Sequence, residues 1–312
     1  MKTTLLIAAI VAVSNGAFAQ TPAIPRTVDG RPDFQGVWMS GSLTPVERIE
    51  GAKALVATDE EARTLAAGAY VKARSREQEI NVDPEGLSAD LKELARVNGQ
   101  WRTSQVVDPS DGKIPRTVEG KRRFDEATQR RKELANDPEA RGLWERCIAG
   151  LGRAPLMAEP SFSLRSIVQT SSDLVIYTEQ GGDPRIIGIG AEHRPPALTS
   201  VLGDSIAWWE GDVLVIETLH QRAEPYRPET RVVERLSLPS PDEVDYQYTV
   251  QDEVLFQRPW TAEFSLHRSR LPMYEYACSE GNYGLANILQ AAREADKRSA
   301  ASMAKSKQAA RR

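Results

Sequence analysis

Histidine is the side chain best suited to acid–base chemistry near neutral pH, and the sequence contains only three histidines. His193 follows Glu192 and precedes Pro195 and Pro196, a composition typical of a surface loop. A loop histidine positioned against a substrate can act as a general acid or base and contribute ~10²–10⁴ in rate. The alternative is a histidine that only satisfies nearby loop carbonyls. We therefore take His193 as the first catalytic candidate.

The three histidines could in principle bind a metal together. His193, His220 and His267 are 27 and 47 residues apart, which matches no short zinc-binding motif. The sequence also lacks a nucleophile elbow, a P-loop and a dinucleotide-binding fingerprint in the required strand–turn–helix context. We therefore expect no metal site and no cofactor.

Glutamates in apolar strand-like segments are the second group of candidates. Glu217 shares one face of its segment with Val213 and Val215, so we expect it to be partly buried and to need a cation or a donor. Glu263 and Glu275 also alternate with apolar neighbours. Desolvated carboxylates are the groups whose pKa rises enough for acid–base work. The alternative is a set of Arg–Glu pairs that merely fills the interior.

Arginines and aromatic side chains of the same region could hold a substrate. Arg185 and Arg235 are candidates to stabilise developing negative charge. Aromatic rings facing a pocket would hold a small aromatic compound, although such residues are more often simply part of a core. The aromatic candidates for substrate binding are Trp209, Tyr248, Trp260 and Tyr276.

These residues must be positioned by a β-rich region, because the hydrophobic period from Ser163 to Cys278 is two. The region contains no helix long enough to serve as a crossover, which favours an antiparallel meander closed into a barrel or half-barrel. A two-sheet sandwich is the alternative. The predicted strands are Leu164–Thr170, Leu174–Glu179, Arg185–Ile189, Val213–Leu219, Arg231–Leu238, Val244–Asp252, Trp260–His267 and Met273–Cys278.

Helices are expected on both sides of this region in the sequence. Thr58–Glu61 has the pattern of a capping box, and Asp137-Pro138 that of an N-cap followed by proline at the first helical position. The N-terminal helices are polar on most of their circumference, so we expect them to lie against another element. The predicted helices are Ala62–Arg76, Ala89–Arg96, Glu119–Leu134, Glu139–Cys147 and a final amphipathic helix, Asn282–Lys297.

Asp33–Trp38 contains a Gly-x-Trp triplet that resembles the opening strand of lipocalin-like (calycin) barrels. In those folds the tryptophan packs across the barrel floor, where a cationic side chain can cover it. The resemblance implies a mainly β fold with α elements: a calycin-like antiparallel barrel with an N-terminal helical elaboration and a C-terminal helix.

A longer resemblance covers most of the chain after the first twenty residues. Trp209–Thr218 (W-x-G-D-x-L-V-x-E-T), Arg258–Thr261 and Tyr274–Gly284 (beginning Y-E-Y-A-C-x-E-G-N) are similar to motifs of a large family of exported bacterial proteins of unassigned function. The family usually has histidine where this chain has Ser279, and asparagine or a similar residue where it has His220. The resemblance therefore implies a fold and a compartment, but no reaction.

The first nineteen residues have the pattern of a secretory signal. Lys2 precedes the apolar run Leu5–Val13, and Ala17-Phe18-Ala19 matches a signal-peptidase site, so cleavage after Ala19 and a periplasmic or secreted location are expected. A buried N-terminal helix is the alternative. In an oxidising compartment Cys147 and Cys278, the only cysteines, would form a disulfide, although two unpaired thiols are the other reading.

Charge is unevenly distributed along a chain whose formal net charge is only −4. Residues 297–312 contain six basic residues and no acidic one. We expect this tail to be disordered and solvated, with weak contact to anionic surfaces or to the protein's own acidic body as the alternative. The near-neutral balance argues against a nucleic-acid partner, and no run after the signal is long enough to span a membrane.

The predicted organisation is a signal peptide (1–19), an extended and helical region (20–147), a β-barrel domain with a terminal helix (148–296) and a basic tail (297–312). The predicted function is that of a cofactor-independent acid–base enzyme, a lyase, isomerase or hydrolase acting on a small aromatic or hydrophobic compound. A non-catalytic periplasmic binding or carrier protein is the alternative, because the same pocket would serve it.

Overall fold

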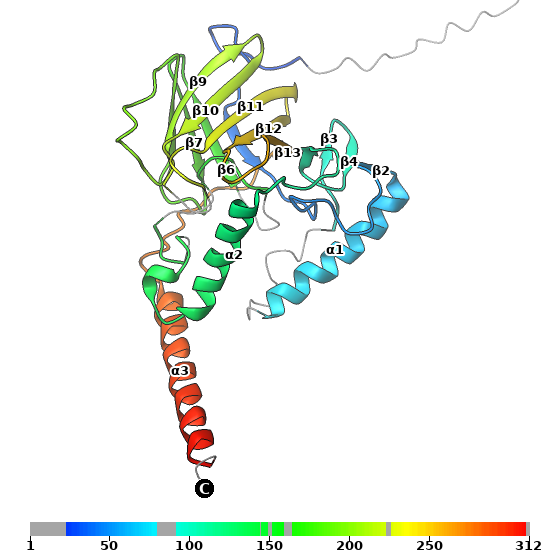
Figure 1. Ribbon diagram of the computed structural model, residues 1–312. Coiled ribbons are helices and arrows are strands. Elements are labelled where there is room, and N and C mark those ends of the chain that lie inside the picture. Colours follow the sequence, from blue (N-terminus) through cyan, green and yellow to red (C-terminus); the bar gives the residue numbers. More distant parts are fainter. Residues whose placement is uncertain are drawn as a thin grey trace, which may run out of the picture.

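The centre of the molecule is a closed β-barrel (Figure 1). The computed structural model describes residues 23–79, 92–143, 145–148, 152–158, 164–222 and 226–309. Nine strands follow one another round the barrel in the order β1-β6-β7-β8-β9-β10-β11-β12-β13, and pairing of β1 with β13 closes it. These strands are β1 (Gly36–Met39), β6 (Leu164–Gln169), β7 (Asp173–Thr178), β8 (Arg185–Ile189), β9 (Asp204–Glu210), β10 (Val213–Leu219), β11 (Arg231–Ser240), β12 (Glu243–Gln251) and β13 (Trp260–Arg268).

Alternation of side chains along the strands builds the core inside the barrel. In β12, the side chains of Val244, Tyr246, Tyr248 and Val250 are buried, while those between them are only partly buried. The same period of two places Leu214, Ile216 and Thr218 of β10 inside the barrel. A period of two is what the sequence predicts here, and the predicted β-barrel is confirmed.

The predicted purely antiparallel order is wrong at one place, because β8 and β9 run parallel. Residues 190–203 carry the chain from the end of β8 back to the level where β8 began. A parallel neighbour needs a connection of about a dozen residues or more, and this loop is long enough to supply one without a helix. The barrel is therefore mixed.

Seven of the eight predicted strands are present, with ends shifted by a few residues at most. The prediction of a strand at Met273–Cys278 is wrong, because the segment pairs with no neighbouring strand in the described structure. Because its side chains are largely exposed, the segment would bury little apolar surface by joining a sheet. Conversely, β9 was not predicted, although it forms a hairpin with β10 across Gly211.

A small second layer contains α1 (Asp59–Glu79) and a three-stranded sheet with the order β2-β4-β3. The sheet consists of β2 (Val56–Ala57), β3 (Arg96–Val97) and β4 (Gln100–Arg102). The predicted capping box is confirmed, since the Thr58 amide donates to Glu61 Oε2 (2.9 Å) and the Glu61 amide to Thr58 Oγ1 (3.3 Å). Ala62 and Ala66 of α1 pack with Leu43 and Leu94 in a core separate from that of the barrel.

Two other predicted helices differ from the structure. Of the helix expected at Ala89–Arg96, residues 92–96 are described and are extended, ending in β3, because Leu94 turns into the small core; the rest lies outside the described residues. Asp137 does cap the next segment, its carboxylate accepting from the Glu139 amide (2.9 Å). That segment is only a 3₁₀ turn, Pro138–Ala140, and the predicted helix Glu139–Cys147 does not continue.

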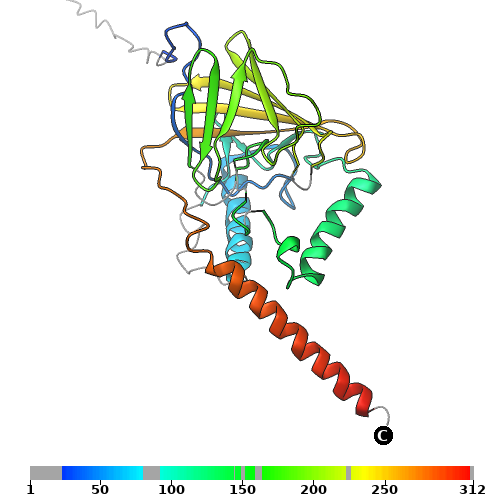
Figure 2. The same cartoon turned by 90° about the vertical axis from the view of Figure 1, so that its left-hand side faces the viewer.

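Two further helices extend from the barrel on the side where α1 also lies (Figures 1 and 2). α2 (Val118–Glu133) begins at Thr117, whose hydroxyl accepts from the Gly120 amide (2.8 Å) and donates to the Val254 carbonyl of the barrel (2.5 Å). α3 (Tyr283–Ala309) is longer than the predicted Asn282–Lys297. Residues 298–309, expected to be disordered, are helical, because their alanine- and lysine-rich composition has high helix propensity.

Residues on both sides of the expected domain boundary at 147 and 148 contribute to the barrel. β1 and β5 (Val106–Asp108) pair with opposite ends of β13, and Trp38 of β1 is completely buried. The expected signal peptide, residues 1–19, lies outside the described residues. Among those that are described, no helix is long and apolar enough to cross a membrane.

Candidate functional site

The imidazole of His193 lies between two carboxylates. Its Nδ1 is 2.8 Å from Asp204 Oδ2, and its Nε2 is 3.2 Å from Glu217 Oε1. The three side chains are 17, 9 and 15 % exposed, respectively. The residues come from the β8–β9 loop, the start of β9 and β10, so the fold brings together groups separated by up to 24 positions.

The β8–β9 loop can reach this position because glycines begin and end it. Gly190 (φ +75°) and Gly203 (φ +78°) have backbone conformations that other residues rarely adopt. A Cβ on Gly203 would also lie 2.7 Å from Thr218 Cγ2 and 2.8 Å from the Leu219 carbonyl. The loop therefore returns close against β10, which places His193 over the outer face of the barrel wall.

Asp204, the first residue after the β8–β9 loop, accepts three hydrogen bonds. Its Oδ2 accepts from the backbone amide of Arg194 (2.9 Å), and its Oδ1 accepts from Arg194 Nε (2.6 Å), in addition to the contact with His193. Burial acts to raise the pKa of Asp204, but the hydrogen bonds from His193 and Arg194 outweigh it and lower the pKa below its ordinary value. Asp204 is therefore held as a carboxylate that orients His193.

Glu217 lies on the outside of the barrel, because its neighbours Ile216 and Thr218 are fully buried inside. Its second carboxylate oxygen accepts a hydrogen bond from Arg231 Nε of β11. Arg231 is held in turn by Gln251 on β12, with Nη1 3.1 Å from Oε1. The expectation that Glu217 is partly buried and partnered by a cation is met by this chain of contacts.

The geometry limits which hydrogen bonds His193 can make with the two carboxylates. A neutral imidazole has one N–H, whereas both ring nitrogens of His193 face carboxylate oxygens. Both contacts can be hydrogen bonds only when the cluster carries one further proton, on the ring or on a carboxylate. The geometry therefore places one carboxylate oxygen within hydrogen-bonding distance of each ring nitrogen of His193.

A cleft of about 400 Å³ lies beside this cluster, between the first halves of β8 and β9. The two strands pair only at Gly188–Ile206 and Ile189–Ala207, so they diverge before those positions. Asp204 belongs to both the cleft and the histidine cluster. The lining is mixed: apolar side chains from Pro184, Ile186, Ala191, Leu202 and Ile206, and polar ones from Arg185, Glu192, Arg194, Asp204, Ser200 and Ser205.

Two of the predicted catalytic glutamates lie elsewhere. Glu263 faces outward from β13 and accepts from Arg102 Nε of the small sheet (2.9 Å), so it connects the two layers of the molecule. Glu275 is exposed on the segment that follows the barrel. The structure thus brings His193 and Glu217 together, but neither Glu263 nor Glu275 joins them.

The two predicted arginines also have different surroundings. Arg185 points into the barrel, is 2 % exposed, and donates to Glu234 through both terminal nitrogens. It reaches the inner end of the cleft with part of its surface. Arg235 lies outside the barrel and pairs with Glu210 (2.8 Å). The interior thus holds a buried ion pair, which is the alternative that the sequence left open for its glutamates.

The aromatic residues predicted to bind substrate do not line the cleft. Tyr248 and Trp260 pack against each other in the barrel core, with ring centroids 5.7 Å apart, and burial raises the pKa of Tyr248. Trp209 stacks on Phe34 at one end of the barrel. Tyr276 is 38 % exposed on the segment after β13. Tyr248, Trp260 and Trp209 thus fit the core interpretation, whereas Tyr276 belongs neither to the core nor to the cleft.

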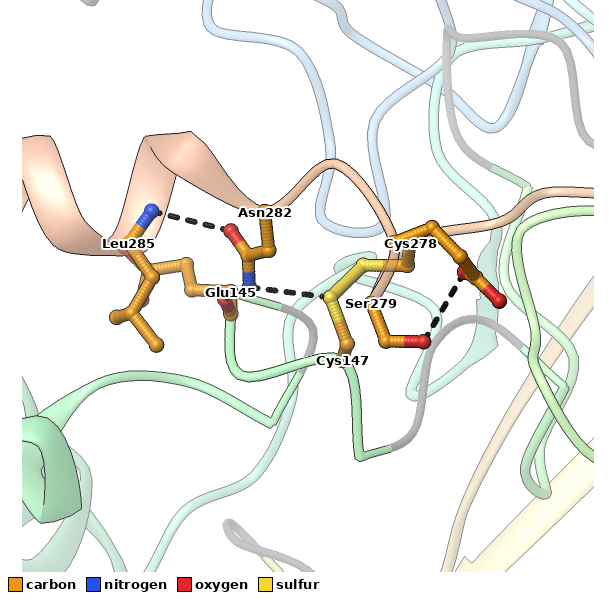
Figure 3. The surroundings of a disulfide bond; sticks show 7 residues. Glu145, Cys147, Cys278, Ser279, Asn282 and Leu285 are labelled. Atoms are coloured by element: carbon orange, nitrogen blue, oxygen red, sulfur yellow. Dashed lines mark hydrogen bonds between the residues drawn. A yellow bond between two sulfur atoms is a disulfide. The ribbon is translucent and has the colours of Figure 1, made fainter.

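The predicted disulfide is confirmed by the structure, in which Cys147 and Cys278 are bonded with their Cα atoms 5.6 Å apart (Figure 3). Asn282 Nδ2 lies 3.1 Å from Cys147 Sγ and donates to the Glu145 carbonyl (3.0 Å). Asn282 Oδ1 accepts from the Leu285 amide (3.0 Å), which caps the first turn of α3. The disulfide and this asparagine together hold the start of α3 against residues 145–147.

Sequence reasoning missed Asp204 and Arg194. Asp204 follows Gly203 and opens a strand whose Trp208-Trp209 pair precedes a Glu-Gly-Asp turn, so a hairpin signal was present. Arg194 directly follows His193, so it lay in the loop that the sequence already singled out. The sequence does not show that the β8–β9 loop folds back onto the barrel. Only this return brings Asp204 next to His193.

Fold and site together define a closed, mixed β-barrel that carries a carboxylate–imidazole–carboxylate cluster on its outer wall. No protein-family model matches the chain, and no curated protein matches it. Within the described residues, no group of three or more His, Cys, Asp or Glu side chains is placed to hold a metal ion.

Proposed function

We propose that the chain is an exported acid–base enzyme that uses no cofactor, a lyase, isomerase or hydrolase, with His193 as the group that transfers the proton. The observation that carries the proposal is the position of His193 between Asp204 and Glu217, beside a cleft of about 400 Å³. Three titratable side chains in contact with one another next to a cleft are typical of a site for proton transfer.

The two contacts of His193 support different roles for its two nitrogens. The shorter contact, from Nδ1 to Asp204, holds the ring in one orientation, since Asp204 is itself held by two donors of Arg194. The longer contact, from Nε2 to Glu217, is the weaker one. We assign Nε2 as the atom that exchanges a proton with the substrate when Glu217 moves aside, with Arg231 retaining Glu217 nearby.

Arg194 is suited to stabilise negative charge that develops on a substrate. Its Nε is engaged by Asp204, while the side chain is 54 % exposed and lines the cleft. A fixed guanidinium beside a proton donor stabilises an anionic transition state most when it needs no reorganisation. In this proposal Arg194 takes the role that the sequence suggested for Arg185 and Arg235.

The cleft supports a small substrate with an apolar and a polar part. Its volume is near the lower end of the usual range of ligand sites, about 300–1,000 Å³. Ile186 and Ile206 supply apolar surface, and the exposed side chains of Glu192 and Arg194 supply charged groups. Since none of the described residues that line the cleft is aromatic, a small hydrophobic compound fits it better than one recognised by ring stacking.

Export is part of the proposal. The disulfide between Cys147 and Cys278 supports it, because such bonds persist in oxidising compartments, and residues 1–19 have the pattern of a signal peptide. N-terminal sequencing of the protein recovered from a periplasmic extract should begin at Gln20. A chain recovered only from the cytosol with Met1 in place would contradict this part.

We also propose that the barrel is calycin-like and that the chain belongs with the exported bacterial proteins whose motifs it shares. The guanidinium carbon of Arg268 lies 4.3 Å from the centroid of the Trp38 ring, and Trp38 Nε1 donates to the Phe34 carbonyl (2.8 Å). This is the covered tryptophan that the Gly-x-Trp triplet suggests. Arg268→Met should lower the free energy of unfolding, because it removes the cation–π contact together with the hydrogen bonds from the guanidinium to the Pro241 and Gln35 carbonyls.

Turnover in a panel of small esters, amides, lactones and eliminable hydroxy compounds tests the enzymatic proposal. His193→Gln should reduce turnover by about 10²–10⁴-fold. His267→Gln, at an exposed position on β13, is the matched control and should leave turnover unchanged. Glu217→Gln should shift the pH–rate profile, which a merely structural contact would not do.

A non-catalytic binding or carrier protein is the second candidate. The observation that favours it is that both ring nitrogens of His193 are already engaged, which would also hold the β8–β9 loop closed over a bound ligand. A carrier would bind compounds from the same panel, detected by calorimetry, without converting any of them. Binding without turnover in the wild-type protein would therefore replace the enzyme by the carrier.

A further inference from the structure

α3 leaves the body of the protein after its first four turns. Leu289 is buried and Leu285 and Ala292 are partly buried, so this part of the helix packs against the molecule. Near the end of this part, the Asp296 carboxylate accepts a hydrogen bond from Asn136 Nδ2 (2.6 Å). Figures 1 and 2 both show the rest of the helix continuing away from the barrel.

The free part of α3 is exposed and carries positive charge only. Residues 297–308 are all exposed, and they include Lys297, Arg298, Lys305 and Lys307 but no acidic residue. Lys297 pairs with Glu294 one turn earlier (2.7 Å). In the described part of the chain no carboxylate pairs with the other three. Arg298 and Lys305 are two turns apart and so lie on one face of the helix.

The protein's own acidic surface does not neutralise this charge. The formal net charge of the chain is −4 with all six basic residues of 297–312 included, so the remainder is considerably more acidic. Because α3 points away from the barrel, its free part does not reach that surface (Figures 1 and 2). The positive charge is therefore available to an external anionic partner.

We propose that the free part of α3, residues 297–309, adsorbs the protein to an anionic phospholipid surface. A lipid surface needs only charge from its partner, and each basic side chain near such a surface increases binding about fivefold, the equivalent of about 1 kcal/mol. A protein partner would instead need large anchoring side chains. Met303, 63 % exposed, is the only large apolar side chain on this part of the helix among the described residues.

The weak apolar face determines the kind of adsorption. The face opposite Arg298 and Lys305 carries Met303, Ala300 and Lys307, so this part of the helix has too little apolar surface for insertion into the lipid. Attraction between charges must then dominate, so binding requires anionic lipid and falls as salt screens it. This distinguishes the proposal from binding by an amphipathic helix that inserts.

Co-sedimentation of the full chain with vesicles tests the proposal. The vesicles contain phosphatidylcholine alone or phosphatidylcholine with about one third phosphatidylglycerol, at salt concentrations of about 0.05 M and about 0.5 M. We expect binding to the anionic vesicles at low salt, loss of that binding at high salt, and no corresponding binding to phosphatidylcholine alone.

Two variants with the same change of net charge locate the site. Lys297→Gln, Arg298→Gln, Lys305→Gln and Lys307→Gln together should lower the partition coefficient by about fivefold for each charge removed. The control replaces four exposed basic residues elsewhere, Lys53, Arg63, Lys72 and Lys113, by glutamine and should retain binding. Circular dichroism checks that α3 stays helical, as glutamine is a good helix former.

Three results would overturn the proposal. One is equal binding by the α3 variant and the control variant. Another is equal binding to vesicles with and without phosphatidylglycerol. The third is no binding to anionic vesicles at low salt, in which case an acidic protein partner in the same compartment becomes the occupant to test. None of these results depends on whether the protein is an enzyme.

Discussion

Arg185 and Glu234 form an ion pair that is buried completely inside the β-barrel. Arg185 Nη1 donates to Glu234 Oε1 (2.9 Å), and the Tyr246 hydroxyl donates to the same oxygen (2.6 Å). Thr218 and Ser205 accept from the remaining guanidinium donors, each at 3.0 Å. The charges of this pair are therefore satisfied inside the barrel, and the candidate site lies on the outer wall.

Removing one partner of this pair should destabilise the protein strongly. Glu234→Gln leaves the buried guanidinium of Arg185 without a counter-charge and should lower the free energy of unfolding by about 3–5 kcal/mol. Urea unfolding followed by tryptophan fluorescence measures the loss. Glu210→Gln, which removes the exposed partner of Arg235, is the control and should cost less than about 1 kcal/mol. Equal losses in the two variants would contradict the burial argument.

Asp204 should make the free energy of unfolding depend on pH in the acid range. Its pKa is lowered in the folded protein because hydrogen bonds from His193 and Arg194 outweigh the effect of burial. A carboxyl with a lowered folded pKa stabilises the fold above its unfolded pKa of about 3.9, and this contribution is lost as pH falls through the folded value. Asp204→Asn should therefore lower stability at pH 7 and flatten its decline below about pH 4.

Urea unfolding at a series of pH values from neutral to acid measures the effect of Asp204. Asp29→Asn, in an exposed turn near the N-terminus of the described chain, is the control and should follow the wild-type curve. If Asp204→Asn kept the wild-type slope in acid, the carboxylate would not be held by His193 and Arg194 as the structure shows.

The disulfide should contribute a large part of the stability, because it closes a long loop. Cys147 and Cys278 are 131 positions apart, and a loop of this length corresponds to about 5 kcal/mol in the chain-entropy account. Cys147→Ser with Cys278→Ser should lower the free energy of unfolding by up to this amount. Reductant should bring the wild-type protein to the level of the variant and leave the variant unchanged. A reductant-sensitive variant would exclude this bond as the cause.

Two glycines in helices should respond to alanine in opposite ways. Gly68 of α1 has open space where a Cβ would be, so Gly68→Ala should stabilise the protein by about 0.5–1 kcal/mol. A Cβ on Gly120 of α2 would overlap the carbonyl oxygen of Leu255. Gly120→Ala should therefore destabilise by about 1–3 kcal/mol despite its better helix propensity, as it pushes α2 off the barrel.

Thermal unfolding of both glycine variants provides the comparison, each variant serving as the other's control. The outcome that would contradict the close packing of α2 on the 252–257 loop is a stabilised Gly120→Ala protein. A destabilised Gly68→Ala protein would contradict the open position of that residue in α1.

Local structure could be read from the sequence wherever neighbouring residues determine it. The capping box at Thr58–Glu61 and the cap at Asp137 depend on side chains within three positions of each other. Seven strands followed from alternation, which is again local. The same reasoning failed for Met273–Cys278, which has the composition of a strand but no neighbouring strand to pair with.

The candidate site was predictable only in part, for a related reason. His193 and Glu217 were identified from residue type and strand parity. Glu263 and Glu275 satisfied the same criteria, and alternation cannot tell the inside of a barrel from the outside or one part of the wall from another. Asp204 was missed because its contact with His193 depends on how residues 190–203 return to the barrel.

The sequence by itself determined the β-rich class, most of the strands, the helix caps and the pair of cysteines available for a bond. Only the tertiary structure decided that the interior is filled by Arg185 and Glu234, that β8 and β9 run parallel, and that His193 meets two carboxylates on the outer wall. The physical reason is distance along the chain. Periodicity and capping depend on residues a few positions apart. Closing a barrel brings together residues far apart in the sequence, and no local pattern indicates that they will be close.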